Sequence, residues 1–207
     1  MARMEAAERT RQLTAAARSV LAREGVANTP LRAVAAEAQV PLGTMQYVFP
    51  SREKLLRTVI EDVVTEIGQV FTDAVHTGDG LAHAIRQGLT AFWSELAANR
   101  DLQIMQYELT TYSLRTPGQE GLARWQYESY ADVVAEWCRA AAEGAGERCA
   151  LGYAQFGRIA VASMDGLILQ YVCDPDDDRA RADLDVIIDM LVALADPQPD
   201  PNSAQGN

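Results

Sequence analysis

The chain has 207 residues, of which 48% are hydrophobic and 23% are charged, and its formal net charge at pH 7 is −11. This length allows one large or two small domains with a hydrophobic core, and the composition is typical of a globular protein. No apolar run approaches the roughly 20 residues that cross a membrane. The N-terminus does not resemble a signal peptide, because charged residues interrupt every apolar stretch there. We therefore expect a cytoplasmic protein. The three cysteines, which lack metal-ligand spacing and are expected to be reduced, are Cys138, Cys149 and Cys173.

Charge is distributed unevenly along the chain. Residues 1–58 hold nine basic and five acidic residues, whereas residues 59–207 hold nine basic and 24 acidic residues. The first segment therefore carries a net charge of +4 and the second a net charge of −15. Because salt screens charges beyond about 8–10 Å, a basic N-terminal segment is able to bind phosphates although the whole chain is acidic.

The N-terminal segment predicts three helices. Residues 4–24 carry apolar side chains at helical spacing, and Gly25 is well placed to end this helix. Thr29-Pro30 predicts the start of a second helix, with the threonine side chain as its cap. Pro41 predicts the start of a third helix, which Phe49-Pro50 ends. Two short helices joined by a tight turn are typical of a helix-turn-helix, whose second helix lies in the major groove of DNA.

The remaining chain predicts further helices separated by breaks that contain Gly or Pro. A long connecting helix starts at Ser51, a candidate N-cap, and runs to about Thr77. No segment shows the sustained alternation of a strand, so we expect an all-α fold. The tail from Asp196 is rich in Pro, Asp and Asn and is expected to be disordered. The other predicted helices cover residues 81–98, 101–113, 120–143, 148–172 and 184–194.

The order of residues 29–56 resembles the DNA-binding signature of the tetracycline-repressor (TetR) family, and the similarity spans roughly residues 8–60. Its most specific part is the ending Gly43-Thr44-Met45-x-Tyr47-x-Phe49. The resemblance implies an N-terminal three-helix DNA-binding domain with a helix-turn-helix, and a C-terminal helical ligand-binding and dimerisation domain. The implied boundaries are residues 1–50 for the first domain, 51–195 for the second with its connecting helix 51–77, and 196–207 for the tail.

Five positions depart from the family's pattern. Gln39 stands where the turn usually has glycine, and Pro41 stands where it usually has a capping serine. Leu42 takes a position that is often polar or basic, Gln46 takes one that is commonly tyrosine, and Arg52 takes one that is usually lysine. The motif is retained because its inward-facing positions are all apolar.

If the apolar residues of the helix 42–48 pack inward, its opposite face is free to meet the DNA groove. Gln46 is able to pair with an adenine edge, and the methyl groups of Leu42 and Thr44 suit a thymine methyl. Tyr47 suits a phosphate contact, which positions rather than specifies. By resemblance, the N-terminus of the connecting helix braces a phosphate. The predicted DNA-binding residues are Thr29, Leu42, Gly43, Thr44, Gln46, Tyr47, Arg52 and Lys54.

The last two helices are the predicted dimer surface. Helix 148–172 is apolar over more of its circumference than one core face requires, and the final helix nearly matches it. Two such helices from each subunit would cover the excess in a four-helix bundle, whereas the alternative is burial within one chain. We therefore expect a homodimer through helices 148–172 and 181–195, bound to a palindromic operator in double-stranded DNA.

The resemblance also implies an effector pocket within residues 60–145, where aromatic side chains recur at helical spacing. Any one of these rings is more often an ordinary core residue than part of a pocket. We expect a small, fairly hydrophobic effector, aromatic or cationic, whose binding moves the helix 51–77 and so changes the spacing of the two DNA-binding domains. The predicted ligand-binding residues are Phe71, Trp93, Met105, Gln106, Tyr112, Trp125, Glu128 and Tyr130.

The leading hypothesis is a sequence-specific transcriptional regulator, most simply a repressor that its effector releases from DNA. The alternative is a helix-turn-helix regulator that is controlled by a protein partner or acts without a small-molecule ligand. An enzyme is not supported, because His76 and His83 lie on separate predicted helices and no Ser/His/Asp, Cys/His or phosphate-binding glycine pattern is present in the sequence. We expect no metal and no cofactor.

Overall fold

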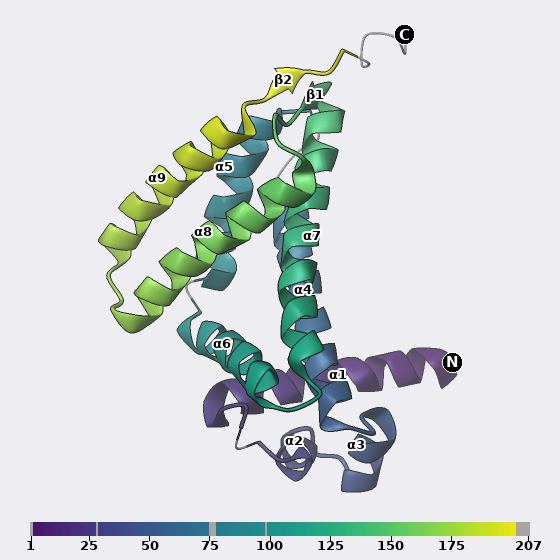
Figure 1. The fold of residues 1–207 in the computed structure, drawn as a ribbon. Coiled ribbons are helices and arrows are strands. Elements are labelled where there is room, and N and C mark those ends of the chain that lie inside the picture. The colour runs from purple at the N-terminus through teal and green to yellow at the C-terminus, as the bar shows by residue number, and fades with distance from the viewer. Residues whose placement is uncertain (1, 28, 75–77, 98, 202–207) are drawn as a thin grey trace. The chain divides into compact units, whose positions relative to one another are not determined.

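The computed structural model describes residues 2–27, 29–74, 78–97 and 99–201, and helices make up most of them (Figure 1). The predicted all-α class is confirmed. Every helix within these ranges is too short or too polar to cross a lipid bilayer.

Contacts divide the chain into two compact units, neither of which is continuous in sequence. Unit 1 comprises residues 1–63 and 100–126, and unit 2 comprises residues 64–99 and 127–207. Residues 100–126 therefore pack with the N-terminal segment, although they lie far from it along the chain. The predicted domain boundary at residue 50 stays a prediction.

Unit 1 contains the three predicted N-terminal helices and the beginning of the connecting helix. Gly25 adopts a φ of +84°, which favours glycine, and ends the first helix as predicted. The Ser51 hydroxyl accepts a hydrogen bond from the Lys54 amide at 3.1 Å, which confirms Ser51 as an N-cap. The helices of this unit are α1 (Ala2–Glu24), α2 (Leu31–Glu37), α3 (Leu42–Val48), the first half of α4 (Arg52–Ala74), α6 (Arg100–Arg115) and the start of α7 (Glu120–Gly144).

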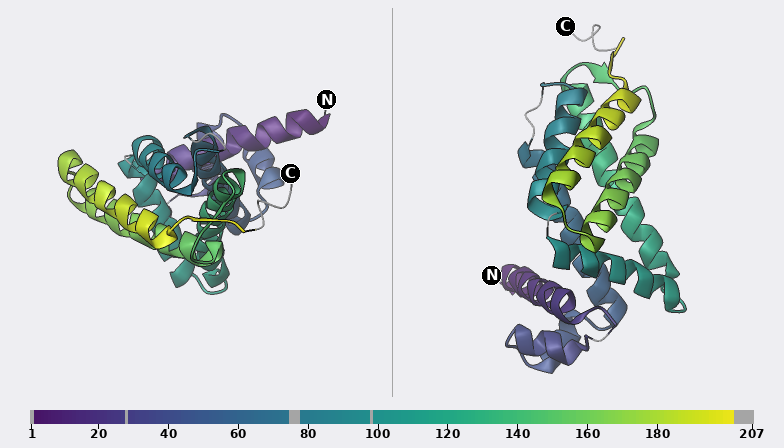
Figure 2. Two further views of the ribbon diagram at one scale, coloured as in Figure 1. Left: turned by 90° about the horizontal axis from the view of Figure 1, so that it is seen from above. Right: turned by 90° about the vertical axis from the view of Figure 1, so that its left-hand side faces the viewer.

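Unit 2 contains the remaining halves of α4 and α7 and the C-terminal helices. Asp176 caps the last helix by accepting from the Arg179 amide at 3.0 Å. In Figure 2, the two C-terminal helices lie side by side and antiparallel. The other elements of this unit are α5 (Leu81–Phe92), a π-helical turn η1 (Trp93–Ala97), β1 (Glu147–Arg148), α8 (Tyr153–Cys173), α9 (Asp177–Ala195) and β2 (Gln198–Pro199).

Helix α9 begins at Asp177 and not at the predicted residue 184, because Asp176 caps it. Two further predictions about the C-terminal half are wrong. Helix α8 begins at Tyr153 rather than at residue 148, and residues 196–201 are ordered rather than disordered. The reason is a pairing of β1 with β2, supported by the Asp200 amide donating to the Gly146 carbonyl at 2.8 Å. These are backbone bonds between distant segments, which leave no periodicity in the side chains. The rest of the predicted tail, residues 202–207, lies outside the described residues, as do residues 75–77 at the predicted end of α4.

Candidate nucleic-acid interface

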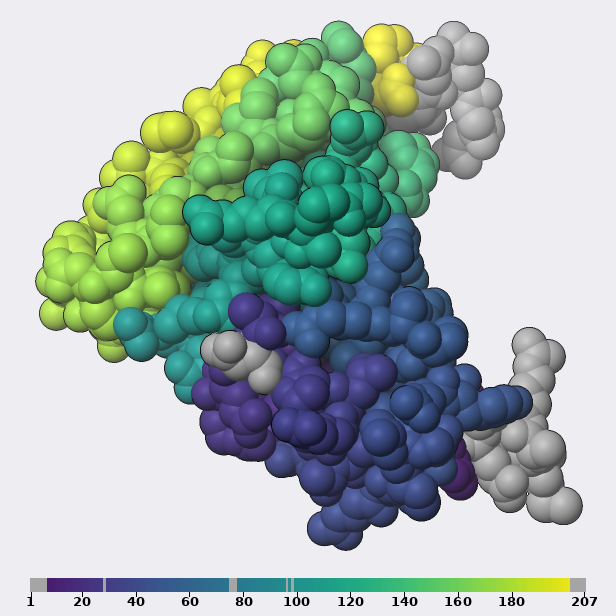
Figure 3. All heavy atoms as spheres, turned by 60° about the horizontal axis from the view of Figure 1, so that its bottom comes forward, coloured from purple at the N-terminus to yellow at the C-terminus, as the bar shows by residue number. Residues whose placement is uncertain are grey.

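The helix-turn-helix is built on a small set of buried apolar side chains in unit 1. Val34 and Ala35 are buried on α2, Met45 is buried on α3, and Phe49 directly after α3 is also buried. These side chains hold the two seven-residue helices against α1 and α4, because helices this short have little stability of their own. The indigo and blue spheres at the bottom of Figure 3 show that α2 and α3 contribute an exposed surface.

The turn between α2 and α3 places a non-glycine residue in the left-handed region. Gln39 has a φ of +56°, as expected at a position where the resembling family usually has glycine. The turn is closed by the Val40 amide, which donates to the Ala35 carbonyl at 3.0 Å. A side chain in this conformation costs about 1 kcal/mol relative to glycine.

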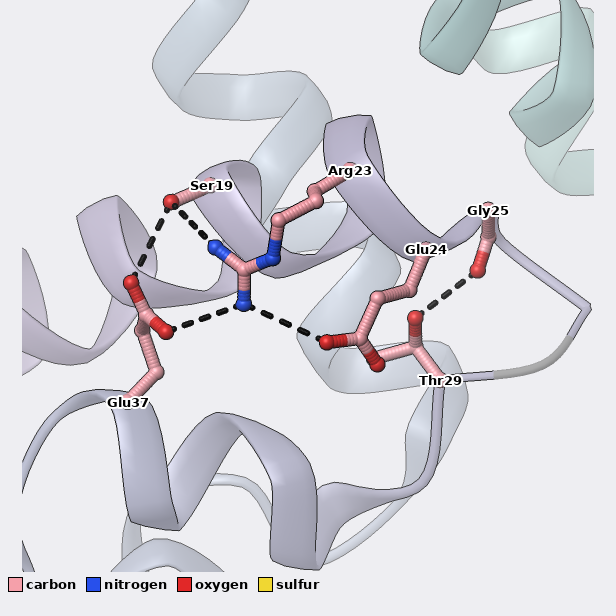
Figure 4. Close-up of polar contacts among 6 residues, drawn as sticks. All are labelled: Ser19, Arg23, Glu24, Gly25, Thr29 and Glu37. Carbon is pink, nitrogen blue, oxygen red and sulfur yellow. Dashed lines mark hydrogen bonds and ion pairs between the residues drawn. The ribbon is translucent and has the colours of Figure 1, made fainter.

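No side chain caps the start of either short helix. Pro30 precedes α2 and Pro41 precedes α3, and neither offers a side-chain acceptor. The predicted capping role of Thr29 is wrong, since Thr29 is buried and its hydroxyl donates to the Gly25 carbonyl at 2.8 Å (Figure 4). The direction in which α2 leaves α1 is therefore set by contacts other than a cap.

A polar network ties α2 to α1 (Figure 4). Arg23 on α1 donates to Glu37 on α2 at 3.0 Å and to Glu24 at 3.2 Å, and the Ser19 hydroxyl donates to Glu37 at 3.3 Å. The hydrogen bond from Arg23 lowers the pKa of the Glu37 carboxyl, and the hydrogen bonds to Glu37 and Glu24 raise the pKa of Arg23. These groups are exposed, so solvent limits what the network contributes to stability.

The outward face of α3 is available to DNA. Tyr47 is 89% exposed and Leu42 is 43% exposed, while Gly43 and Gln46 are also exposed and Thr44 is half-buried. The structure thus brings these five predicted DNA-binding residues together on one short helix. Side chains of this kind on a helix that enters the major groove meet base edges and phosphates.

The other three predicted DNA-binding residues lie outside α3, and only one of the three is exposed. Lys54 is exposed on the first turn of α4. Thr29 is engaged inside unit 1, and so is Arg52, whose guanidinium donates to the backbone carbonyls of Thr29, at 2.5 Å, and of Val26. The Arg52 guanidinium also lies 5.0 Å from the centre of the Tyr112 ring, a cation–π arrangement.

Four of the predicted ligand-binding residues belong to unit 1. Met105 is buried, and the Gln106 amide donates to Gln103 at 3.2 Å. The rings of the other two residues, Tyr112 and Trp125, lie beneath arginines of α4, since the Arg57 guanidinium lies 4.3 Å from the Trp125 ring.

The other four predicted ligand-binding residues belong to unit 2, and one of them lines a groove of about 740 Å³. Phe71 stacks on Trp137 in this groove, with ring centres 4.6 Å apart. Trp137 packs so closely against Gly88 that a side chain there would collide with its ring. Trp93 and Tyr130 instead make edge-to-face contacts elsewhere, with Tyr171 and Tyr127 respectively, and Glu128 is exposed.

Carboxylates line the same groove beside the rings. Asp132 is exposed there, and Glu136 pairs with Arg139 at 2.5 Å. The hydrogen bond from Arg139 lowers the pKa of the Glu136 carboxyl. The predicted set missed Trp137 and Tyr153, which also line the groove. The aromatic spacing of residues 120–143 contains Trp137, but spacing alone does not show which rings meet a cavity.

The C-terminal helices expose an apolar stripe. Val186, Met190 and Leu194 recur every four residues along α9 and are 59%, 57% and 37% exposed, while Leu169 on α8 is 49% exposed. The opposite face of α9 is buried within unit 2. Helix α9 is therefore apolar on two faces, and the described part of the chain covers one of them.

Metal-binding chemistry finds no support in the described part of the chain. No group of three or more His, Cys, Asp or Glu residues there is arranged to hold an ion. The thiols of Cys138 and Cys149 are buried and that of Cys173 is exposed, and all three are free.

Comparisons with known proteins agree with this geometry. Residues 13–59 match the model of the bacterial regulatory proteins of the tetR family, and residues 76–194 match a tetracyclin repressor-like C-terminal domain. The chain is 24% identical over 187 residues to the HTH-type nicotine-responsive transcriptional repressor HdnoR of Paenarthrobacter nicotinovorans, covering 90% of this chain and 95% of that one.

Solved structures share the fold at low sequence identity. A TetR-family transcriptional regulator from Rhodococcus sp. superposes with a TM-score of 0.77 at 14% identity, covering 91% of this chain and 99% of that one. The complex of SmeT with triclosan gives a TM-score of 0.68 at 19% identity, covering 94% and 93% of the two chains.

Proposed function

The chain belongs to the TetR family of bacterial regulatory proteins and is a DNA-binding transcriptional regulator, and we propose that it is a repressor that leaves a palindromic operator when a small aromatic effector binds. The observation that carries the proposal is the outward face of α3, where Tyr47 is 89% exposed on a helix whose other face is buried. The family assignment also confirms that the chain is a regulator rather than an enzyme.

Sequence choice is assigned to the exposed side chains of α3. Gln46 offers a bidentate amide that matches an adenine edge, and Leu42 offers an apolar surface for a thymine methyl. Tyr47 and Lys54 supply phosphate contacts, which set affinity and register. The basic N-terminal segment attracts the DNA backbone although the whole chain is acidic.

A palindromic operator requires two copies of the chain, and support for a homodimer comes from α8 and α9. The exposed stripe of Val186, Met190 and Leu194 lies on the face of α9 opposite to its buried face. Pairing α8 and α9 of two copies in a four-helix bundle would remove this surface from water, at about 25 cal/mol per Å² of apolar area. A two-fold dimer then presents two α3 helices to two half-sites.

The effector is assigned to the groove of unit 2 rather than to a protein partner. Its stacked rings, Phe71 and Trp137, offer an apolar surface. Glu136 is already paired with Arg139, so the exposed carboxylate of Asp132 is the group that favours a ligand with a positive charge. HdnoR is named as nicotine-responsive and the SmeT structure is a complex with triclosan, and both nicotine and triclosan contain aromatic rings. An open groove of 740 Å³ is also the size of a small-molecule site.

The DNA-binding half is tested by a gel-shift titration against DNA from upstream of the protein's own coding region, at two salt concentrations. We expect tight binding to a palindrome that resists competitor DNA. Gln46→Ala should reduce the difference in affinity between operator and random DNA, whereas Tyr47→Phe should weaken binding to both. Equal loss on both DNAs for Gln46→Ala would remove that residue from sequence recognition. If selected random-sequence DNA also failed to bind, the operator proposal would be wrong.

The effector half is tested by adding nicotine to the protein–operator complex and following release by fluorescence anisotropy. We expect release from the wild type, and expect Trp137→Ala to respond only at much higher concentrations while binding operator normally. Trp93→Phe is the control, because Trp93 makes an edge-to-face contact with Tyr171 and is not among the residues that line the groove. Equal responses of Trp137→Ala and wild type would place the effector elsewhere.

A further inference from the structure

The connection between α1 and α2 is held by side chains from outside the helix-turn-helix. Of residues 25–30, the structure describes all except residue 28. The Thr29 hydroxyl donates to the Gly25 carbonyl, which closes the connection on itself. Two further side chains of unit 1 bind its backbone: Glu108 of α6 binds the Val26 amide, and Arg52 of α4 binds the carbonyls of Val26 and Thr29.

Glu108 binds the start of the connection. Its Oε2 accepts a hydrogen bond from the Val26 amide at 2.7 Å. The same carboxylate packs against Gly25, since a Cβ at Gly25 would lie 3.2 Å from Oε2. Gly25 therefore serves two needs, a positive φ and the close approach of this carboxylate. A hydrogen bond from an amide to a carboxylate is charge-assisted and stronger than one to a neutral acceptor.

Arg52 binds backbone carbonyls of the same connection. Its two terminal nitrogens donate to the carbonyls of Val26 and Thr29, so the amide and the carbonyl of Val26 are held from two different helices. Tyr112, one helical turn after Glu108 on α6, lies under the Arg52 guanidinium at 5.0 Å. One face of α6 thus supplies both the carboxylate and the ring that supports the arginine.

This arrangement matters for the start of α2, because the polar network of Arg23 and Ser19 reaches α2 only at Glu37, its last residue. Helix α2 has seven residues, no side-chain cap at its start, and only Val34 and Ala35 buried along it. A shift of Val26 or Thr29 would therefore carry α2, and with it the recognition helix α3, away from its place in unit 1. A binding element is held in place to within a fraction of an ångström by residues that support it without touching the ligand.

We propose that Glu108 and Arg52 are positioning residues for operator binding, which fix the α1–α2 connection and so orient α3, without touching DNA themselves. The inference rests on the DNA-binding function of the chain. It replaces the expectation that Arg52 braces a phosphate, and it adds a residue of α6, 82 positions along the chain from Val26, to the DNA-binding machinery.

A surface charge and a positioning residue predict opposite changes in operator affinity when Glu108 is replaced. On charge alone, removing an acidic residue from a DNA-binding unit strengthens binding, because a negative charge near the phosphates is lost. As a positioning residue, Glu108→Ala should instead weaken operator binding about ten-fold or more. Glu108→Gln keeps an acceptor oxygen for the Val26 amide and should stay within about three-fold of the wild type.

Arg52 offers an independent test that does not depend on Glu108. A phosphate contact would be preserved by Arg52→Lys, which keeps the positive charge. A lysine has no planar fork with which to donate to two carbonyls, so the positioning role predicts that Arg52→Lys loses about ten-fold in operator affinity while weak binding to random DNA is kept. Operator affinity equal to the wild type for Arg52→Lys would overturn the role assigned to Arg52.

The experiment measures operator affinity by fluorescence anisotropy for full-length Glu108→Ala, Glu108→Gln and Arg52→Lys, with Glu120→Ala as control. Glu120 is an exposed acid of unit 1, and its removal should leave binding unchanged or slightly tighter. Amide hydrogen exchange of the peptide covering residues 21–27 is followed in parallel, and should become faster in Glu108→Ala and Arg52→Lys. Circular dichroism checks that each variant keeps its helices.

Two results would overturn the proposal: operator binding by Glu108→Ala as tight as or tighter than the wild type, or unchanged exchange of residues 21–27. Should Glu108→Ala fail to fold, Arg52→Lys still decides, because it removes the paired hydrogen bonds to the two carbonyls with little change of volume. If even the wild type bound no palindrome, the proposed repressor function would fail, and the exchange measurement would still decide whether the two side chains hold the connection.

Discussion

Different interactions stabilise the interior of each of the two compact units. In unit 1, side-chain hydrogen bonds fix short helices and their connections, as with Glu108 and Arg52 around Val26, and Arg18 of α1 paired with Asp62 of α4 at 2.6 Å. In unit 2, long helices meet through stacked rings and small residues, such as Phe71 on Trp137 and Gly157 of α8 against α7.

The difference follows from helix length. Helices of about 20 residues bury enough apolar surface for packing to determine their positions, whereas seven-residue helices do not. Directional hydrogen bonds then supply the precision that a recognition helix needs. We therefore expect packing changes to destabilise unit 2 strongly, and polar or backbone changes in unit 1 to have smaller effects on stability than on DNA binding.

The largest effect is expected for Gly157→Ala. A Cβ at this position would collide with the backbone carbonyl oxygen of Ala131 and lie 3.3 Å from the Ala135 Cβ, and a backbone atom cannot rotate away. Moving α8 off α7 should cost about 2–3 kcal/mol, seen as a lower Tm in thermal circular dichroism. Gly121→Ala is the matched control, because nothing lies within 4 Å of its Cβ. An unchanged Tm for Gly157→Ala would mean that the α7–α8 contact is loose.

Asp165→Asn should stabilise unit 2. Burial raises the pKa of the Asp165 carboxyl, and a hydrogen bond from Tyr127 opposes this only in part. The folded state therefore favours the protonated form, and its stability falls as the pH rises through the raised pKa. At pH 7 the amide should raise Tm by roughly 2–4 °C, the shift given by about 1 kcal/mol in a chain of this size.

The gain from Asp165→Asn should shrink as the pH is lowered through the raised pKa, because the wild-type carboxyl then becomes neutral. Asp185→Asn on the exposed surface of α9 is the control and should change little at any pH. No gain at pH 7 would indicate that the bond from Tyr127 compensates fully for burial, so that unit 2 also relies on polar contacts.

Gln39→Gly should stabilise unit 1 slightly. Gln39 has a φ of +56°, and glycine adopts this conformation without strain, so we expect a gain of about 0.5–1 kcal/mol with operator affinity kept. Gln39→Ala keeps the backbone strain and removes the side-chain amide, so it separates the effect of strain from that of side-chain contacts. A lower Tm for Gln39→Gly would show that the flexibility of glycine in the unfolded chain outweighs the relief of strain.

The smallest effect is expected for the network of Arg23 and Glu37. Arg23 lowers the pKa of Glu37, so the pair stabilises the folded state at neutral pH, and this contribution is lost as the pH falls through the lowered pKa. A double-mutant cycle with Arg23→Gln and Glu37→Gln should give a small coupling in urea unfolding at pH 7 that vanishes in acid and in high salt. A coupling that persisted in acid would require contacts other than this charge pair.

Sequence patterns were most informative where structure depends on neighbours along the chain. The apolar spacing and breaks predicted α1 to α4, including Gly25 as a C-terminal stop and Ser51 as an N-cap, and the outward face of α3 followed from its buried positions. They failed where distant segments interact. The pairing of β1 with β2, the burial of Thr29 and the choice of Trp137 as a groove residue all depend on partners that no local pattern identifies.

The sequence by itself therefore determined the helical class, the family and the recognition helix, because periodicity, capping and turn chemistry act over a few residues. Only the tertiary structure decided which residues steady that helix. Glu108 meets Val26 across 82 positions and Arg52 meets it across 26, and such contacts exist only after the chain has packed. In the sequence, Glu108 and Arg52 look like surface charges. In the folded chain, one binds the amide of Val26 and the other binds its carbonyl.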